Sequence, residues 1–213
     1  MYLHHLTKKK LVCAFPKLLA AGLAQLFSYY LPSVLKIGTE RSLRLPIDDA
    51  IPYVSAFVVL YVFAFLQWVL QWLFLAAEGE PALGRFVTAE IIGKLLSLGF
   101  FLLMPVTMVR QADTGSGLFG SLVALLYAID APTRLFPSMH CFLAWIWMRA
   151  VLCSKNVTRS TKLLTVLLAL GICASTLFIK QHLFVDVPAG IALAEISLLL
   201  ADALSRRKKR AEA

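Results

Sequence analysis

The chain has 213 residues, of which 60% are apolar and 15% are charged. Soluble domains carry about 45–50% apolar and about 25% charged residues, so this composition excludes a soluble domain, a disordered chain and a disulfide-stapled fold. The formal net charge of +9 is compatible with an anionic membrane surface or with nucleic acid. We therefore expect a membrane protein, and the positions of the charges decide between these two partners.

Long uncharged segments occur six times along the chain, separated by joints that contain polar residues, proline or glycine. At about 20 apolar residues per crossing, each segment can span a bilayer. The predicted spans are residues 11–35, 51–77, 86–109, 137–153, 163–179 and 183–204. Open sheet edges cannot lie in lipid and no strand period is visible, so the sequence predicts an all-α bundle of about six transmembrane helices. Residues 1–213 are expected to form a single integral membrane domain.

Lysine and arginine divide unevenly between the two ends of this predicted bundle. Thirteen fall at the end with both termini, namely Lys8, Lys9, Lys10, Lys17, Arg85, Lys155, Arg159, Lys162, Arg206, Arg207, Lys208, Lys209 and Arg210. Six fall at the opposite end, namely Lys36, Arg41, Arg44, Arg110, Arg134 and Lys180. By the positive-inside rule, both termini are predicted to be cytoplasmic. A cleaved N-terminal signal peptide, which would leave five spans, is the alternative.

Other partners are not expected. The basic tail at residues 206–210 lacks accompanying stacking aromatics, so it predicts contact with anionic lipid and no binding of nucleic acid. The cysteines, Cys13, Cys141, Cys153 and Cys173, lack the spacing of metal ligands. We predict neither a metal nor another cofactor, and the oligomeric state stays open.

A short polar cluster, Phe136-Pro137-Ser138-Met139-His140, begins the fourth predicted span. Proline and serine are ordinary helix-start residues, so an N-cap is the alternative role for Ser138. Burying a histidine at this position is costly unless it pairs or reaches water, which makes His140 a candidate functional residue. A structural histidine in the core is the alternative.

A second polar cluster spans residues 175–186 and contains Lys180, His182 and Asp186. His182 and Asp186 are four residues apart, so on a helix the carboxylate accepts a proton from one imidazole nitrogen. That hydrogen bond fixes the tautomer and leaves the other nitrogen free as a nucleophile. A snorkelling lysine beside a structural histidine is the alternative.

Arg110 closes the third predicted span and therefore reaches the same end of the bundle as both clusters. Two cations, a hydroxyl and two imidazoles suit an oxyanion, and phosphate is the one we expect. Asp130 and Arg134, in the loop before the first cluster, are expected to pair with each other rather than to contact a head group.

These elements together resemble the three-part signature of the type 2 phosphatidic acid phosphatase and haloperoxidase superfamily. The matching positions are Arg110, the Pro-Ser-Met-His sequence at 137–140, and then Ser175, His182 and Asp186. The resemblance covers about residues 100–190, and the segments 127–133 and 178–182 are similar to the bacterial membrane branch in particular.

The resemblance implies roles for the individual residues. His182 would attack phosphorus to form a phosphohistidine, with Asp186 orienting its ring. His140 would protonate the leaving oxygen and then activate the acceptor of the second step. The phosphoryl oxygens would be held, without a metal, by Arg110, Ser138 and Lys180.

Three positions depart from the family pattern. The lysine that usually precedes the arginine by seven residues is Leu103, and the proline that usually follows that arginine is Gln111. The arginine that usually follows the serine of the third element is Thr176. Lys180, two residues before His182, is the basic residue left to replace a missing charge.

The sequence therefore predicts a metal-independent membrane lipid phosphatase that acts on the extracytoplasmic face of a bacterial plasma membrane. Its expected substrate is a lipid phosphomonoester or pyrophosphate, such as a phosphatidate-like lipid or a polyprenyl pyrophosphate. One alternative is a lipid phosphotransferase that passes a head group to an alcohol, similar to inositolphosphorylceramide synthases. The other is a non-catalytic transporter or scaffold that only binds lipid phosphate.

Overall fold

The computed structural model describes residues 6–35 and 37–211. Within these ranges the regular secondary structure is helical, and the one pairing between extended segments is an isolated bridge from Arg41 to Val106. The elements are α1 (Lys8–Leu35), α2 (Pro46–Ala50), η2 (Ser55–Phe57), α3 (Val58–Glu78), α4 (Ala82–Leu103), α5 (Gly117–Ile129), α6 (Met139–Cys153), α7 (Arg159–Phe178) and α8 (Asp186–Ala211). Five helices, α1, α3, α4, α7 and α8, are long and apolar enough to cross a membrane, which confirms a polytopic helical bundle.

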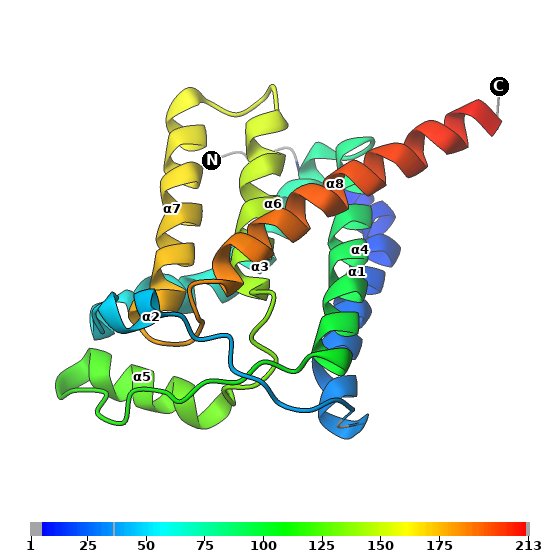
Figure 1. Cartoon of the computed structure of the whole chain (residues 1–213). Helices are drawn as coiled ribbons and strands as arrows, with labels where there is room; N and C mark the ends of the chain where they lie inside the picture. Colours follow the sequence, from blue (N-terminus) through cyan, green and yellow to red (C-terminus); the bar gives the residue numbers. More distant parts are fainter. Residues whose placement is uncertain (1–5, 36, 212–213) are drawn as a thin grey trace.

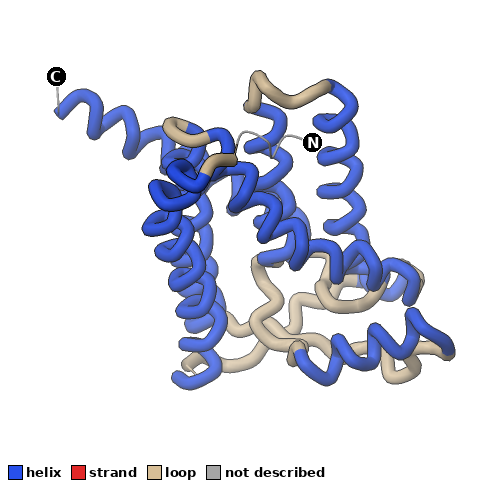
Figure 2. Tube along the Cα trace, turned by 180° about the vertical axis from the view of Figure 1, so that it is seen from behind, coloured by secondary structure: helices blue, strands red, loops and turns tan. Residues whose placement is uncertain are grey.

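The two ends of the described chain lie at one end of the bundle, and α2 and α5 lie at the other (Figure 1). The joints between α3 and α4 and between α6 and α7 share the end with the termini. α8 runs obliquely and packs against α4 and α6. Figure 2 shows the long loops gathered at the opposite end, next to α5, so most irregular backbone of the described chain lies there.

Three helices are shorter than the predicted spans, and proline accounts for two of these differences. α4 ends at Leu103 rather than at residue 109, because Pro105 disfavours helical backbone at Met104. α3 begins at Val58 rather than at residue 51, after a segment that contains Pro52. α6 has 15 residues, or about 22 Å at 1.5 Å per residue, which is shorter than a bilayer core of about 30 Å. Its first residues therefore begin inside the bundle (Figure 1).

α5 falls in a region that the sequence analysis treats as a loop. This 13-residue helix lies across the end of the bundle (Figure 1) and buries Val123 and Leu126 against it. Leu118, Leu125 and Ile129 are 71%, 58% and 73% exposed. A helix with an exposed apolar side at the end of a membrane bundle is suited to lie in the bilayer interface.

Close packing brings the start of α8 against the start of α6. A Cβ atom at Gly190 would lie only 2.4 Å from the carbonyl oxygen of Ser138. Glycine is therefore required if these two helices are to approach so closely. The same contact holds the beginning of α6, with His140, next to the beginning of α8, with Asp186.

A buried polar network joins α1, α3 and α4 within the bundle. Lys94 Nζ donates to Glu90 Oε1 at 2.5 Å, which confirms the pairing that their spacing predicts, and also to the carbonyl oxygen of Ala21 at 3.0 Å. Gln71 and Trp72 of α3 donate to Glu90 at 3.1 and 3.2 Å. Because each charge has several partners, the network stabilises the contact between these helices instead of leaving a charge unpaired.

We predict that Lys94→Met destabilises the fold by about 3–5 kcal/mol, because it leaves the buried Glu90 carboxylate without its cation. Unfolding of the purified protein in detergent measures the change. The double variant Glu90→Gln, Lys94→Met should recover much of the loss. Lys17→Met, which removes the cation of an exposed pair with Glu80, should cost less than about 1 kcal/mol. Equal losses for Lys94→Met and Lys17→Met would contradict this assignment.

Candidate active site

A tight turn after α7 determines where His182 lies. The carbonyl oxygen of Thr176, in the last turn of α7, accepts hydrogen bonds from the backbone amides of Gln181 (2.9 Å) and His182 (3.0 Å). Lys180 has a φ of 52°, so the chain passes through left-handed backbone just before these residues. As a result, the side chains of Gln181 and His182 are buried, at 2% and 8% exposure.

Lys180 is tied to α2. Its Nζ donates to the carbonyl oxygens of Asp48 (2.9 Å) and Ile51 (2.5 Å), at and beyond the C-terminal end of that helix. Helix C-termini carry unsatisfied carbonyl groups that attract an ammonium. Two of the three ammonium donors are thus used for anchoring, and the predicted contact of Lys180 with phosphate stays a prediction.

Asp186 orients the ring of His182. Its Oδ2 atom lies 3.2 Å from His182 Nδ1 and accepts a hydrogen bond from the backbone amide of Leu183 at 2.9 Å. Asp186 is fully buried at the start of α8. With Nδ1 engaged, Nε2 is the nitrogen of His182 available for another atom.

The environment of His182 also shifts its pKa. Burial, the largest single effect, lowers the pKa, but the hydrogen bond and the charge of Asp186, with smaller contributions from other groups, together raise it by more. The pKa of His182 therefore lies above its ordinary value of 6.5.

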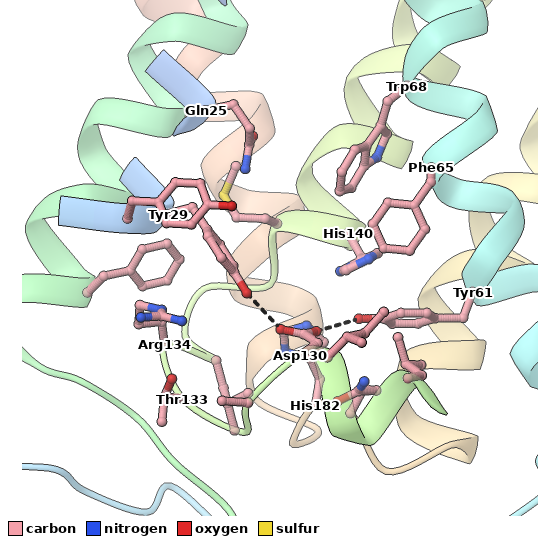
Figure 3. Close-up of a pocket in the computed structure, with 18 of the residues that line it drawn as sticks. Gln25, Tyr29, Tyr61, Phe65, Trp68, Asp130, Thr133, Arg134, His140 and His182 are labelled. Atoms are coloured by element: carbon pink, nitrogen blue, oxygen red, sulfur yellow. Dashed lines mark hydrogen bonds between the residues drawn. The ribbon is translucent and has the colours of Figure 1, made fainter. Parts of the chain in front are cut away.

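His140 faces the same space from α6. Its ring centroid lies 6.0 Å from that of His182, and the ring stacks on Tyr61 of α3 at 4.2 Å. Phe65 and Trp68, one and two turns along α3, complete an aromatic wall (Figure 3). His140 Nε2 is buried and has no hydrogen-bond partner, which is rare for a buried polar atom unless a ligand or water supplies one.

Ser138 occupies the N-cap of α6. Its Oγ accepts a hydrogen bond from the backbone amide of Cys141 at 3.4 Å, and its own amide donates to the carbonyl oxygen of Asp186 at 3.1 Å. The structure thus shows the capping role that was the alternative for this serine. A contact between Ser138, which is fully buried, and phosphate stays a prediction.

Arg110 approaches His182 from the segment after α4. One guanidinium nitrogen donates to Gln181 Oε1 and another to the carbonyl oxygen of Tyr127 at 3.3 Å. The guanidinium also lies 4.6 Å from the centre of the Tyr127 ring. Arg110 is therefore held in one orientation by Tyr127 of α5 and by the residue that precedes His182.

Two cavities meet at His182. The larger, of about 330 Å³, is lined by His140, His182, Gln181 and the aromatic wall of α3. The smaller, of about 180 Å³, is lined by His182 together with three basic residues, Arg44, Arg110 and Lys180. His182 thus lines both a mainly apolar cavity and a basic one.

Asp130 and Arg134 also line the larger cavity, but the expected ion pair between them is not present in the structure. Asp130 instead accepts hydrogen bonds from the hydroxyl groups of Tyr29 (3.0 Å) and Tyr61 (3.4 Å) (Figure 3). Arg134 bonds to Ser33 Oγ and lies 4.7 Å from the centre of the Tyr29 ring. The Tyr29 side chain thus contacts both residues.

The structure brings all six predicted site residues to this region. His140, His182 and Asp186 form one group, Ser138 bonds to the backbone of Asp186, and Arg110 and Lys180 line the smaller cavity. Sequence reasoning missed Gln181 and Tyr127, which hold Arg110. Both residues lie in the segments 127–133 and 178–182 that resemble the bacterial membrane branch, but that resemblance assigned no role to either of them. Among the described residues, no group of three or more His, Cys, Asp or Glu lies close enough to hold a metal ion.

A family model described as the PAP2 superfamily matches residues 83–210. The matched stretch runs from α4 into α8 and includes all six predicted site residues. No curated protein and no solved structure matches the chain. Since the match covers more than half of the sequence, the chain belongs to the PAP2 superfamily, and this membership supports a phosphatase-type activity on lipid phosphate.

Proposed function

We propose that this protein is an integral membrane lipid phosphatase that hydrolyses a lipid phosphomonoester or pyrophosphate through a phosphohistidine at His182. The observation that carries the proposal is the pair of facing histidines. The ring of His182 is oriented by Asp186 and lies 6.0 Å from the ring of His140. Both rings line the larger cavity, so a phosphoryl group in that cavity could contact both of them.

In the first step, His182 Nε2 attacks phosphorus and the bond from phosphorus to the lipid oxygen breaks. Protonated His140 gives its proton to that oxygen, and the lipid alcohol leaves. In the second step, neutral His140 removes a proton from water, which attacks the phosphohistidine. The N–P bond breaks, inorganic phosphate forms, and both imidazoles return to their starting states.

The positive charges of Arg110 and Lys180 would stabilise the charge on the phosphoryl oxygens during both steps. Arg44, which lines the same small cavity, adds a third basic side chain. Lys180 and Arg44 lie outside the positions of the two basic residues that the family usually has and this chain lacks. They support a phosphoryl site despite Leu103 and Thr176.

A lipid substrate is supported by the apolar surroundings of the larger cavity. Aromatic rings of α3 line it, and two residues of α5, Leu126 and Ile129, form part of its wall. Ile129 is also 73% exposed, so the wall of the cavity is continuous with the apolar outer surface of α5. A phosphatidate-like lipid or a polyprenyl pyrophosphate could place its chain along this surface.

We further propose that the site faces the extracytoplasmic side. His140 lies at the start of α6 and His182 between α7 and α8, and these parts of the chain lie toward the end of the bundle opposite to the termini (Figure 1). The lysine-rich and arginine-rich segments, including residues 206–210, belong to the end with the termini. The positive-inside rule assigns that basic end to the cytoplasm.

Phosphotransfer to an alcohol is the second candidate, and Asp130 favours it. Each oxygen of this carboxylate accepts one tyrosine hydroxyl and keeps a lone pair for a further donor. An acceptor alcohol in the larger cavity could use it. Incubation of the purified protein with a labelled phospholipid and an alcohol separates the two functions, because hydrolysis releases free phosphate and transfer yields a new lipid-linked product.

We predict that His182→Ala abolishes phosphate release and leaves the unfolding profile in detergent nearly unchanged, because it removes the nucleophile from a loop position. A labelled lipid phosphate should transfer label to the wild-type protein, in an acid-labile and base-stable linkage, and not to His182→Ala. Undiminished phosphate release by His182→Ala would falsify the mechanism.

We predict that the acid limb of the kcat/KM profile lies above pH 6.5, because attack requires neutral His182 and Asp186 raises the pKa of this imidazole. Asp186→Asn removes the two largest contributions that raise the pKa of His182 and leaves burial, which lowers it. The acid limb should therefore move to lower pH, and kcat should fall by about 10³–10⁴-fold because the tautomer is no longer imposed. Comparing the two profiles on one substrate cancels the titration of the lipid phosphate itself. An unchanged acid limb would rule out His182 as the titrating group.

A further inference from the structure

We propose that Gln181 is a catalytic residue that donates a hydrogen bond from Nε2 to a phosphoryl oxygen during transfer. The proposal rests on the proposed phosphatase site and adds a contact to it. Gln181 directly precedes the nucleophile, and both line the larger cavity together with His140. The family usually has an arginine where this chain has Thr176, and a donor at position 181 could replace part of the hydrogen bonding of that arginine.

The orientation of the amide follows from its bond with Arg110. A guanidinium has five donors and no acceptor, so the atom of Gln181 that faces it must be the carbonyl oxygen, Oε1. The NH₂ group must then point to the other side. Because Arg110 is held by Tyr127 through a hydrogen bond and ring contact, this orientation of Gln181 is determined before any ligand arrives.

The NH₂ group of Gln181 is buried and has no hydrogen-bond partner in the structure. The side chain is only 2% exposed, so bulk water does not surround it. Two further nitrogens near His182 are in the same state, Arg110 Nε and His140 Nε2. Buried donors without an acceptor are costly, and the donors Gln181 Nε2 and Arg110 Nε, together with an imidazole nitrogen that can carry a proton, fit a site whose acceptor is an oxyanion.

The turn after α7 explains why Gln181 rather than Lys180 enters the larger cavity. Thr176 holds the backbone amides of both Gln181 and His182 through one carbonyl oxygen. Lys180, with its positive φ, instead reaches the end of α2. Position 176 thus contributes a backbone acceptor that positions a neutral amide donor next to the nucleophile.

The effect of an amide donor can be distinguished from that of the missing arginine by measuring kcat and KM. The amide adds no charge to attract the phosphate over a distance, and it acts through one directed hydrogen bond. Removing one such donor from an oxyanion site lowers kcat by about 10²–10³-fold. Uniform weakening of substrate binding would instead raise KM and leave kcat unchanged.

The test compares Gln181→Met with Gln67→Met in the full-length protein in detergent. Methionine keeps the length of glutamine and removes its donors. Gln67 is a matched control, since it is also fully buried in the bundle, has an amide oxygen without a partner, and lines neither cavity. Phosphate release is measured as kcat and KM, and binding of orthovanadate, an oxyanion probe, is measured separately by calorimetry.

We expect Gln181→Met to lower kcat by about 10²–10³-fold and to weaken orthovanadate binding by about ten- to hundred-fold. Gln67→Met should change neither. Unchanged orthovanadate affinity in Gln181→Met would overturn the proposal, and so would a wild-type protein that does not bind orthovanadate. If the wild-type protein binds orthovanadate through Gln181 but releases no phosphate, the donor role stands and the phosphatase function is the part that fails.

Discussion

The arrangement of the site depends on the hydrogen bonds that Asp186 makes. Its carboxylate binds the imidazole of His182 and the backbone amide of Leu183, and its carbonyl oxygen accepts the amide of Ser138. One residue therefore connects the turn after α7, the start of α8 and the start of α6. Gly190, one turn further along α8, allows the two helices to come close enough for these bonds to form. The distance between the two histidines follows from this junction.

The buried polar groups of the bundle are of two kinds, those that are paired within the protein and those that have no partner. Glu90 and Lys94 bury full charges, but each finds its partners within the protein, and the result is a stable contact between helices. At the opposite end, Gln181 Nε2 and His140 Nε2 are equally buried and have no partner. An unpaired buried polar group costs free energy, and a ligand that bonds to these nitrogens would offset that cost at the site.

The long apolar runs made both the helices and the candidate histidines predictable from the sequence. Long apolar runs can only be membrane helices, and a charge within such a run must pair, so the Glu90–Lys94 contact was predictable from spacing alone. Helix ends were less predictable: Pro105 ends α4 six residues earlier than the apolar pattern does. α5 was missed because its 13 residues are too few to span a bilayer, and its in-plane position depends on packing against η2 and α3.

By itself, the sequence determined that this protein is a helical membrane bundle and that His140, His182 and Asp186 are its candidate catalytic residues, since spacing alone puts an acid beside one imidazole. Only the tertiary structure decided what surrounds these residues. Whether Lys180 or Gln181 points into the larger cavity depends on one residue with positive φ, and the orientation of the Gln181 amide depends on Arg110, which is 71 positions away in the chain. Contacts of that kind follow from how distant segments pack, and no local pattern of residue types records them.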